Sequence, residues 1–131
     1  MIVLDTHALL WWVNDPSVLS TPAKKAIDAA AASKSVYVSC ISSWEIALLV
    51  ERGRLRLALD VRDWLYRCEA LPFLAFVAVD SSIAVESVRL PDFPHADPAD
   101  RIIASTALSL GASLVTKDDK LRNYPHLKTI W

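Results

Sequence analysis

The sequence predicts an α/β fold built on a mostly parallel central sheet. Short runs rich in β-branched residues alternate with longer helical patterns along the whole chain, which is typical of βα units. The length of 131 residues suits one compact domain, since domains cluster around ~100 to 150 residues. The composition is 53% hydrophobic, above the roughly 45 to 50% of ordinary soluble domains, so we expect a partner to cover part of the surface.

Each element in the first half of the chain has a feature that marks it. The strands are short apolar runs. The alanine-rich helix has Pro22 in its first turn, where the missing N–H costs nothing. The next helix stops at Gly53, and the last is amphipathic and stops at Pro72. In order, these elements are expected at residues 2–4, 6–13, 21–33, 36–39, 43–52 and 60–71.

The second half continues the alternation. Its clearest helix has Pro98 in the first turn and Gly111 as a C-terminal cap. A loop with two prolines precedes this helix at 91–94. In order, the strands and helices are expected at residues 74–79, 81–90, 98–110, 113–116, 119–123 and 127–130.

Composition excludes several classes of protein. The chain has only two glycines, Gly53 and Gly111, which excludes both the dinucleotide fingerprint and the P-loop. The two cysteines, Cys40 and Cys68, are too few for a disulfide framework and indicate reduced thiols. A net charge of −1 argues against binding nucleic acid by bulk charge. No targeting segment or membrane span is evident, so we expect a cytoplasmic protein.

Four carboxylates are candidates for the chemistry: Asp5, Glu45, Asp100 and Asp118. Each lies at or just after a predicted junction where a strand or loop becomes a helix. Ligands of open parallel sheets bind outside the carboxyl ends of the strands. Four like charges that converge there would repel one another unless a cation lay between them. Ligands that are all oxygen favour Mg²⁺, with Mn²⁺ as a substitute.

Helix capping is the competing interpretation of each acid. The first and last of the four would cap the helices that follow them, and Ser42 with Glu45 fits a capping box. Asp97 would cap the helix whose first turn holds Asp100. Whether Asp97 also takes a direct part in the site stays open.

Zinc is disfavoured by the distribution of its usual ligands. The histidines never pair with a cysteine at finger-like spacing; they are His7, His95 and His126. We expect His7 to be a satisfied polar residue on the first helix and His95 to lie in a loop.

Four segments in this order resemble the PIN domain family, and among its members the VapC-type toxins of prokaryotic toxin–antitoxin pairs. They are Ile-Val-Leu-Asp-Thr-His-Ala-Leu-Leu-Trp-Trp at 2–12, Ser-Ser-Trp-Glu-Ile-Ala at 42–47, Asp-Pro-Ala-Asp-Arg-Ile-Ile-Ala at 97–104 and Leu-Val-Thr-Lys-Asp at 114–118. The resemblance covers essentially the whole chain. It implies a single PIN domain over residues 1–131, with a three-layer α/β/α sandwich.

The resemblance also implies an activity. Such a domain would be a Mg²⁺-dependent endoribonuclease that leaves a 5′-phosphate and a 3′-hydroxyl, with no covalent intermediate. Asp5 and Asp100 match the primary metal ligands, and Glu45 and Asp118 complete the shell or orient water. The same resemblance implies a cognate antitoxin that blocks the acids with a basic side chain, and a homodimer.

Further side chains are candidates for supporting roles. Thr6 and Thr116 would hydrogen-bond carboxylates or water, or else cap helices. Five basic residues would bind the RNA backbone, or else lie in solvated loops and salt bridges: Arg52, Arg54, Arg56, Arg101 and Lys117.

Three other functions stay open. A binding module would use its acids only as caps and would present Trp11, Trp12 and Trp64, although the first two, being adjacent on a helix, cannot face the same way. A phosphotransfer enzyme would use Asp5 as nucleophile, but the second Asp expected two residues later is His7. A solitary PIN nuclease would lack an antitoxin.

Overall fold

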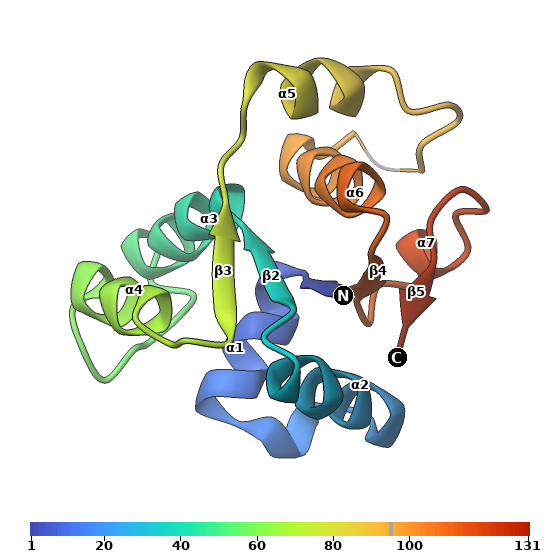
Figure 1. Ribbon diagram of the computed structural model, residues 1–131. Coiled ribbons are helices and arrows are strands. Elements are labelled where there is room, and N and C mark those ends of the chain that lie inside the picture. Colours follow the sequence, from blue (N-terminus) through green and yellow to red (C-terminus); the bar gives the residue numbers. More distant parts are fainter. Residues whose placement is uncertain (95) are drawn as a thin grey trace.

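The computed structural model describes residues 1–94 and 96–131, so the predicted loop position of His95 lies outside the described residues. The described residues form one sheet in the order β3-β2-β1-β4-β5, in which every neighbouring pair is parallel (Figure 1). The prediction of a mostly parallel sheet is therefore confirmed. The strands are β1 (Ile2–Leu4), β2 (Val36–Ser39), β3 (Leu74–Val77), β4 (Ser113–Val115) and β5 (Thr129–Ile130).

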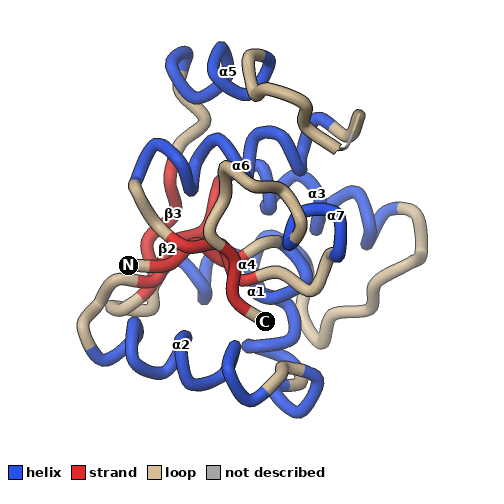
Figure 2. Tube along the Cα trace, turned by 90° about the vertical axis from the view of Figure 1, so that its right-hand side faces the viewer, coloured by secondary structure: helices blue, strands red, loops and turns tan. Residues whose placement is uncertain are grey.

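Helices cover both faces of the sheet, which confirms the three-layer sandwich. On one face α6 packs against β1, β2 and β4, and α5 lies outside it; α2 covers the opposite face (Figures 1 and 2). A 3₁₀ turn at Pro16–Val18 follows the first helix and was not expected. The helices are α1 (Thr6–Asn14), α2 (Thr21–Ala32), α3 (Cys40–Glu51), α4 (Val61–Glu69), α5 (Ser81–Val88), α6 (Pro98–Leu110) and α7 (Asp119–Arg122).

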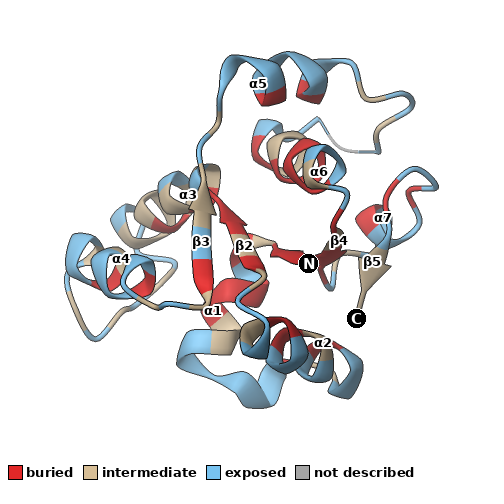
Figure 3. Ribbon diagram, viewed as in Figure 1, coloured by how far each residue is buried: buried red, intermediate tan, exposed pale blue. Residues whose placement is uncertain are grey.

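The strands near the centre are buried on both faces because successive side chains point to opposite sides. In β1, Leu4 belongs to the core cluster that contains Leu9 of α1 and Ile27 of α2. Val3 belongs to the second cluster, with Ile103 of α6. Figure 3 shows this buried centre and the exposed outer surfaces of the helices. The two core clusters thus bury β1 from both sides of the sheet and fix the position of its carboxyl end.

The start of α3 differs from the prediction. The helix begins at Cys40, directly after β2, and its N-cap is Ser39. The capping box of Ser42 with Glu45 is therefore wrong. Ser42 lies inside the helix, is fully buried and is hydrogen-bonded to Thr6. The strand runs into the helix without a loop, so the serine that ends the strand also caps the helix.

Helix α6 has the predicted bounds because its end signals are local. The Asp97 side chain caps it by accepting from the backbone N–H of Ala99, with an oxygen to nitrogen distance of 2.8 Å. Pro98 occupies the first turn, and Gly111 closes the helix at φ 63°, a left-handed conformation. Among the described residues, no helix is both long enough and apolar enough to cross a membrane.

Candidate functional site

A cavity of about 230 Å³ opens at the carboxyl ends of β1 and β4. All four acids predicted from the sequence line it, although they come from residues 5 to 118 of the chain. The other lining residues are Thr6, His7, Trp11, Asp97, Ile103 and Lys117. The parallel sheet produces this convergence, because Asp5 follows β1 directly and Asp118 follows the neighbouring β4 after a short loop.

Asp5 caps α1 and lines the cavity at the same time. Its Oδ1 accepts from the backbone N–H of Ala8 at 2.8 Å. Burial raises the pKa of Asp5, and the negative charge of Asp118 raises it further, whereas hydrogen bonds from Thr116 and Ala8 and the neighbouring His7 lower it. The carboxylate is thus oriented by hydrogen bonds in a place where its negative charge is poorly solvated.

Glu45 reaches the cavity from α3 and is held by Thr6. The Thr6 hydroxyl donates to Glu45 Oε1 at 2.5 Å and is also hydrogen-bonded to Ser42 Oγ at 2.9 Å. Burial is the largest cause that raises the pKa of Glu45, and the negative charges of Asp97 and Asp5 add to it. The prediction that Thr6 hydrogen-bonds a carboxylate is confirmed.

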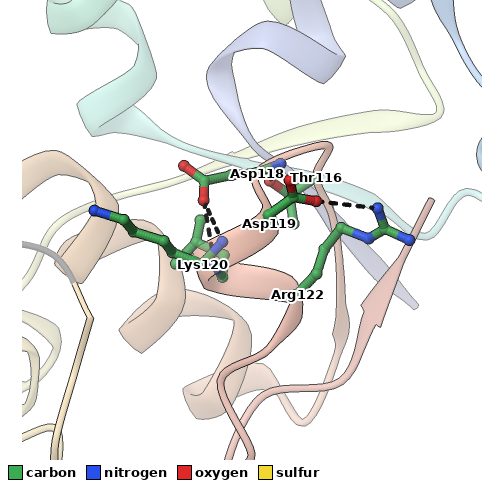
Figure 4. A network of polar contacts seen from close by, with 6 residues as sticks. Thr116, Asp118, Asp119, Lys120 and Arg122 are labelled. Carbon is green, nitrogen blue, oxygen red and sulfur yellow. Dashed lines mark hydrogen bonds and ion pairs between the residues drawn. The ribbon is translucent and has the colours of Figure 1, made fainter.

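Asp118 is likewise both a cap and a wall of the cavity. Its Oδ1 accepts from the backbone N–H groups of Lys120 at 2.8 Å and Leu121 at 3.2 Å, at the start of α7 (Figure 4). Its own backbone N–H donates to Thr116 Oγ1 at 3.1 Å. Since Thr116 also hydrogen-bonds Asp5, one threonine connects the two acids at neighbouring strand ends.

The two acids at the start of α6 complete the lining. Asp97 is the N-cap, as predicted, and Asp100 lies in the first turn. Both line the cavity. Capping and exposure to the cavity therefore coincide in three of the five acids there, Asp5, Asp97 and Asp118.

The acidic side chains that line the cavity are chemically suited to bind a hard divalent cation. Carboxylate oxygens predominate on the cavity walls, and Mg²⁺ and Mn²⁺ prefer oxygen ligands. Burial and the like charges around them raise the pKa of both Asp5 and Glu45, and a cation offsets that cost. Within residues 1–94 and 96–131, no three Asp, Glu, His or Cys side chains stand close enough together to form a ready metal site.

The basic residues next to two of the acids have different surroundings. Lys117 lines the cavity, with Nζ 5.9 Å from the centre of the Trp11 ring. Arg101 turns instead toward α5, where it donates to the Ser87 carbonyl at 3.3 Å and lies over the Phe93 ring. Arg101 therefore contacts α5 and the Phe93 ring and does not line the cavity, because adjacent helix residues point about 100° apart.

The tryptophans have separate environments. For Trp11 and Trp12 this was predicted, because adjacent residues on a helix cannot face the same way. Trp11 lines the cavity, whereas Trp12 packs edge-on against Phe73. Trp64 is buried, and its ring N–H donates to Asn14 Oδ1 at 3.2 Å. Trp12 and Trp64 thus belong to core packing and offer little to a binding module.

Sequence reasoning missed His7 and Trp11 as walls of the cavity. His7 is exposed at the cavity, and its ring centroid lies 5.6 Å from that of Trp11. Their spacing was the signal that could have revealed them. His7 lies only two residues after Asp5, and Trp11, four residues after His7, shares its helix face. Neither cysteine lines the cavity, and burial raises the pKa of both free thiols, that of Cys68 to about 11.

Comparison with known proteins decides the family. A protein-family model described as "PIN domain" matches residues 2–127. The chain belongs to the PIN domain family. It is 38% identical over 132 residues to "Ribonuclease VapC22" of Mycobacterium tuberculosis (strain ATCC 25618 / H37Rv), a match that covers 99% of this chain and 98% of that relative.

Solved structures share the fold of this PIN domain. "VapBC2 from Rickettsia felis bound to a DNA fragment from their promoter" has a TM-score of 0.71 at 18% identity and covers 98% of this chain and 97% of its own. "FitAcB from Neisseria gonorrhoeae" has a TM-score of 0.68 at 20% identity, covering 98% and 96%. A "Toxin-antitoxin complex from Klebsiella pneumoniae" has a TM-score of 0.63 at 20% identity, covering 97% and 95%.

Proposed function

We propose that this PIN domain is a divalent-metal-dependent endoribonuclease and the toxin of a toxin–antitoxin pair. The observation that carries the proposal is the cavity lined by Asp5, Glu45, Asp100 and Asp118 in a chain that is 38% identical, end to end, to a protein named as a ribonuclease. The proposal treats residues 1–131 as a single PIN domain, which the one sheet covered on both faces supports.

In this mechanism Asp5 and Asp100 are the primary ligands of Mg²⁺, for which Mn²⁺ is a substitute. Glu45 and Asp118 complete the shell or orient water. When bound, the ion supplies Lewis-acid stabilisation of phosphate charge and lowers the pKa of a water. The products are a 5′-phosphate and a 3′-hydroxyl.

The surrounding side chains position the acids and the substrate. Thr6 holds the carboxylate of Glu45 and Thr116 orients Asp5, so that both acids point in fixed directions before RNA arrives. Lys117, the basic side chain on the cavity wall, attracts the phosphate backbone. Asp97 takes a supporting role: it caps α6 on the cavity wall, and its negative charge raises the pKa of Glu45.

The partners follow from the same proposal. We expect a cognate antitoxin that covers the cavity and places a basic side chain among the acids, and a homodimer of the toxin. The similarity in fold to the toxin–antitoxin complex from Klebsiella pneumoniae supports the antitoxin. A small DNA-binding protein encoded immediately upstream is the expected genetic arrangement. Two free cysteines agree with a reducing, cytoplasmic setting.

A non-catalytic binding module is the second candidate, because Asp5, Asp97 and Asp118 each cap a helix. A solitary nuclease without an antitoxin differs from the main proposal only in its genetic neighbourhood. The phosphotransfer alternative lacks support, since His7 occupies the place of its second acid and is exposed at the cavity.

The decisive experiment replaces Asp5 with Asn. Asn retains helix-capping ability, so the melting temperature should change little. RNA cleavage in Mg²⁺ or Mn²⁺ should fall on the order of 1000-fold, since several kcal/mol of transition-state stabilisation are removed. Cleavage is measured on a mixed RNA pool from single-turnover time courses. Undiminished cleavage by Asp5→Asn, at equal purity, would contradict the proposed site.

A further inference from the structure

A second depression of about 520 Å³ opens beside the acid cavity and shares two wall residues with it. Glu45 and Asp97 line both. Its remaining walls come from α3, from the turn after it and from the residues around the start of α6. We call it the Trp44 groove, after the aromatic side chain on its wall.

Trp44 is unusually exposed for its size. With 57% of its surface accessible, it is the most exposed of the five tryptophans, all of which lie within the described residues. Large aromatic side chains are mostly buried in folded proteins. Trp44 and Glu45 of α3 both line the groove, so an exposed aromatic surface lies beside one of the proposed catalytic acids.

The far end of the groove is positively charged. Leu48 and Arg52 follow Trp44 at intervals of four residues, so the three share one face of α3 and its cap. Gly53 adopts a left-handed φ of 69°, which turns the chain so that Arg54 also lines the groove. Within residues 1–94 and 96–131, neither arginine forms an ion pair.

The order of these groups matches a short stretch of single-stranded RNA. Aromatic side chains stack on unpaired bases, and arginines bind backbone phosphates. From Trp44 to Arg52 the helix rises about 12 Å, at 1.5 Å per residue. Trp44 and Glu45 therefore lie at one end of the groove, and Arg52 and Arg54 lie toward the other end.

We propose that the Trp44 groove is a nucleotide-binding subsite of the nuclease. A base adjacent to the cleaved phosphodiester stacks on Trp44, and a backbone phosphate beyond it is bound by Arg52 and Arg54. The inference rests on the proposed ribonuclease function and adds to it the residues that hold the flanking RNA.

The test separates RNA binding from cleavage. Trp44→Ala should raise KM for a short single-stranded RNA by about 5- to 150-fold, the range for removing one base–aromatic stack, and should change kcat less than about twofold. Trp44→Phe should restore most of the affinity. Tyr66→Ala is the control, because Tyr66 is an aromatic with 74% exposure on α4, outside the groove. Melting temperatures exclude unfolding.

The arginines are tested by salt dependence. RNA binding is measured by fluorescence anisotropy in EDTA, where cleavage is absent. The double variant Arg52→Gln/Arg54→Gln should reduce the slope of log Kd against log salt by about 0.7 for each phosphate that the protein no longer binds. Arg67→Gln, an exposed arginine on α4, should leave the slope unchanged.

The outcomes distinguish the two proposals. If the wild type cleaves RNA but Trp44→Ala matches Tyr66→Ala in KM and in Kd, the subsite is wrong and the nuclease stands. If Trp44→Ala lowers kcat with KM unchanged, the subsite is also wrong. If the wild type fails to cleave RNA in either Mg²⁺ or Mn²⁺ yet binds RNA through Trp44, the proposed nuclease activity is wrong and the RNA-binding site stands.

Discussion

Two sets of aspartates begin helices in this protein, and only one set faces the cavity. Asp60 caps α4 and Asp80 caps α5 in the same way that Asp5 caps α1: a carboxylate oxygen accepts a backbone N–H at 3.1, 2.9 and 2.8 Å. Asp60 and Asp80 are exposed, whereas Asp5 is half-buried beside Asp118, and burial raises its pKa.

The comparison shows that an aspartate can cap a helix and line the cavity at the same time. One carboxylate oxygen satisfies a helix start, and the location of that start decides what else the side chain does. At the carboxyl ends of β1 and β4, several helix starts meet, so their negative charges accumulate. At the starts of α4 and α5, each carboxylate remains in solvent.

Ion-dependent stability tests this comparison most strongly. Saturating Mg²⁺ or Mn²⁺, at about 100 times its Kd, should stabilise the native protein by about 2.7 kcal/mol and so raise the melting temperature by about 10 °C. Asp5→Asn should abolish the rise, whereas Asp80→Asn should keep it. Differential scanning fluorimetry with and without EDTA measures the shift. No shift in either ion would favour the binding module.

The capping aspartates Asp118 and Asp60 form a second pair, which RNA cleavage should distinguish. Asp118→Asn should lower cleavage about 10- to 100-fold, the usual cost of disturbing a group that supports a metal site, while its cap is retained. Asp60→Asn should cleave like the wild type. Initial rates at saturating RNA provide the measurement. Equal activity of the two variants would remove Asp118 from the site.

The smallest expected effect concerns stability. Asp60→Ala and Asp80→Ala each remove a cap and should cost about 1 kcal/mol of unfolding free energy, with no effect on cleavage. Urea unfolding followed by circular dichroism measures the change. If either variant also reduced nuclease activity as strongly as substitution of the acids of the cavity, the division between the two sets of aspartates would be wrong.

The prediction of α6 from sequence succeeded, and that of the start of α3 did not. The ends of α6 depend on neighbouring residues, namely Asp97 with Pro98 at one end and Gly111 at the other. The start of α3 depends on where β2 stops pairing with its neighbours, which no local signal marks. Ser42 resembled a cap, but tertiary packing buries it against Thr6.

The candidate site likewise combines features that the local sequence marks with features that depend on tertiary packing. The four acids were recognisable because Asp5 and Glu45 are isolated charges in apolar segments and the other two lie at predicted junctions. The resemblance to PIN domains implied that all four belong to one site. The turn of Arg101 toward Phe93 was not predictable, since it depends on α5 packing beside α6. The exposure of Trp44 was equally hidden, because an apolar helix face gives no sign of what covers it.

The sequence alone was enough to predict the alternation of strands and helices, the bounds of α6, the family and four acids that line the cavity. These properties depend on neighbouring residues and on ordered motifs, so they can be read along the chain. Tertiary packing, by contrast, brings acids from residues 5 to 118 to one cavity of about 230 Å³ and places Trp44 and two arginines on the walls of a depression beside it. The physical reason is that parallel pairing of β1 with β4 and packing of α3 beside α6 join segments far apart in the sequence.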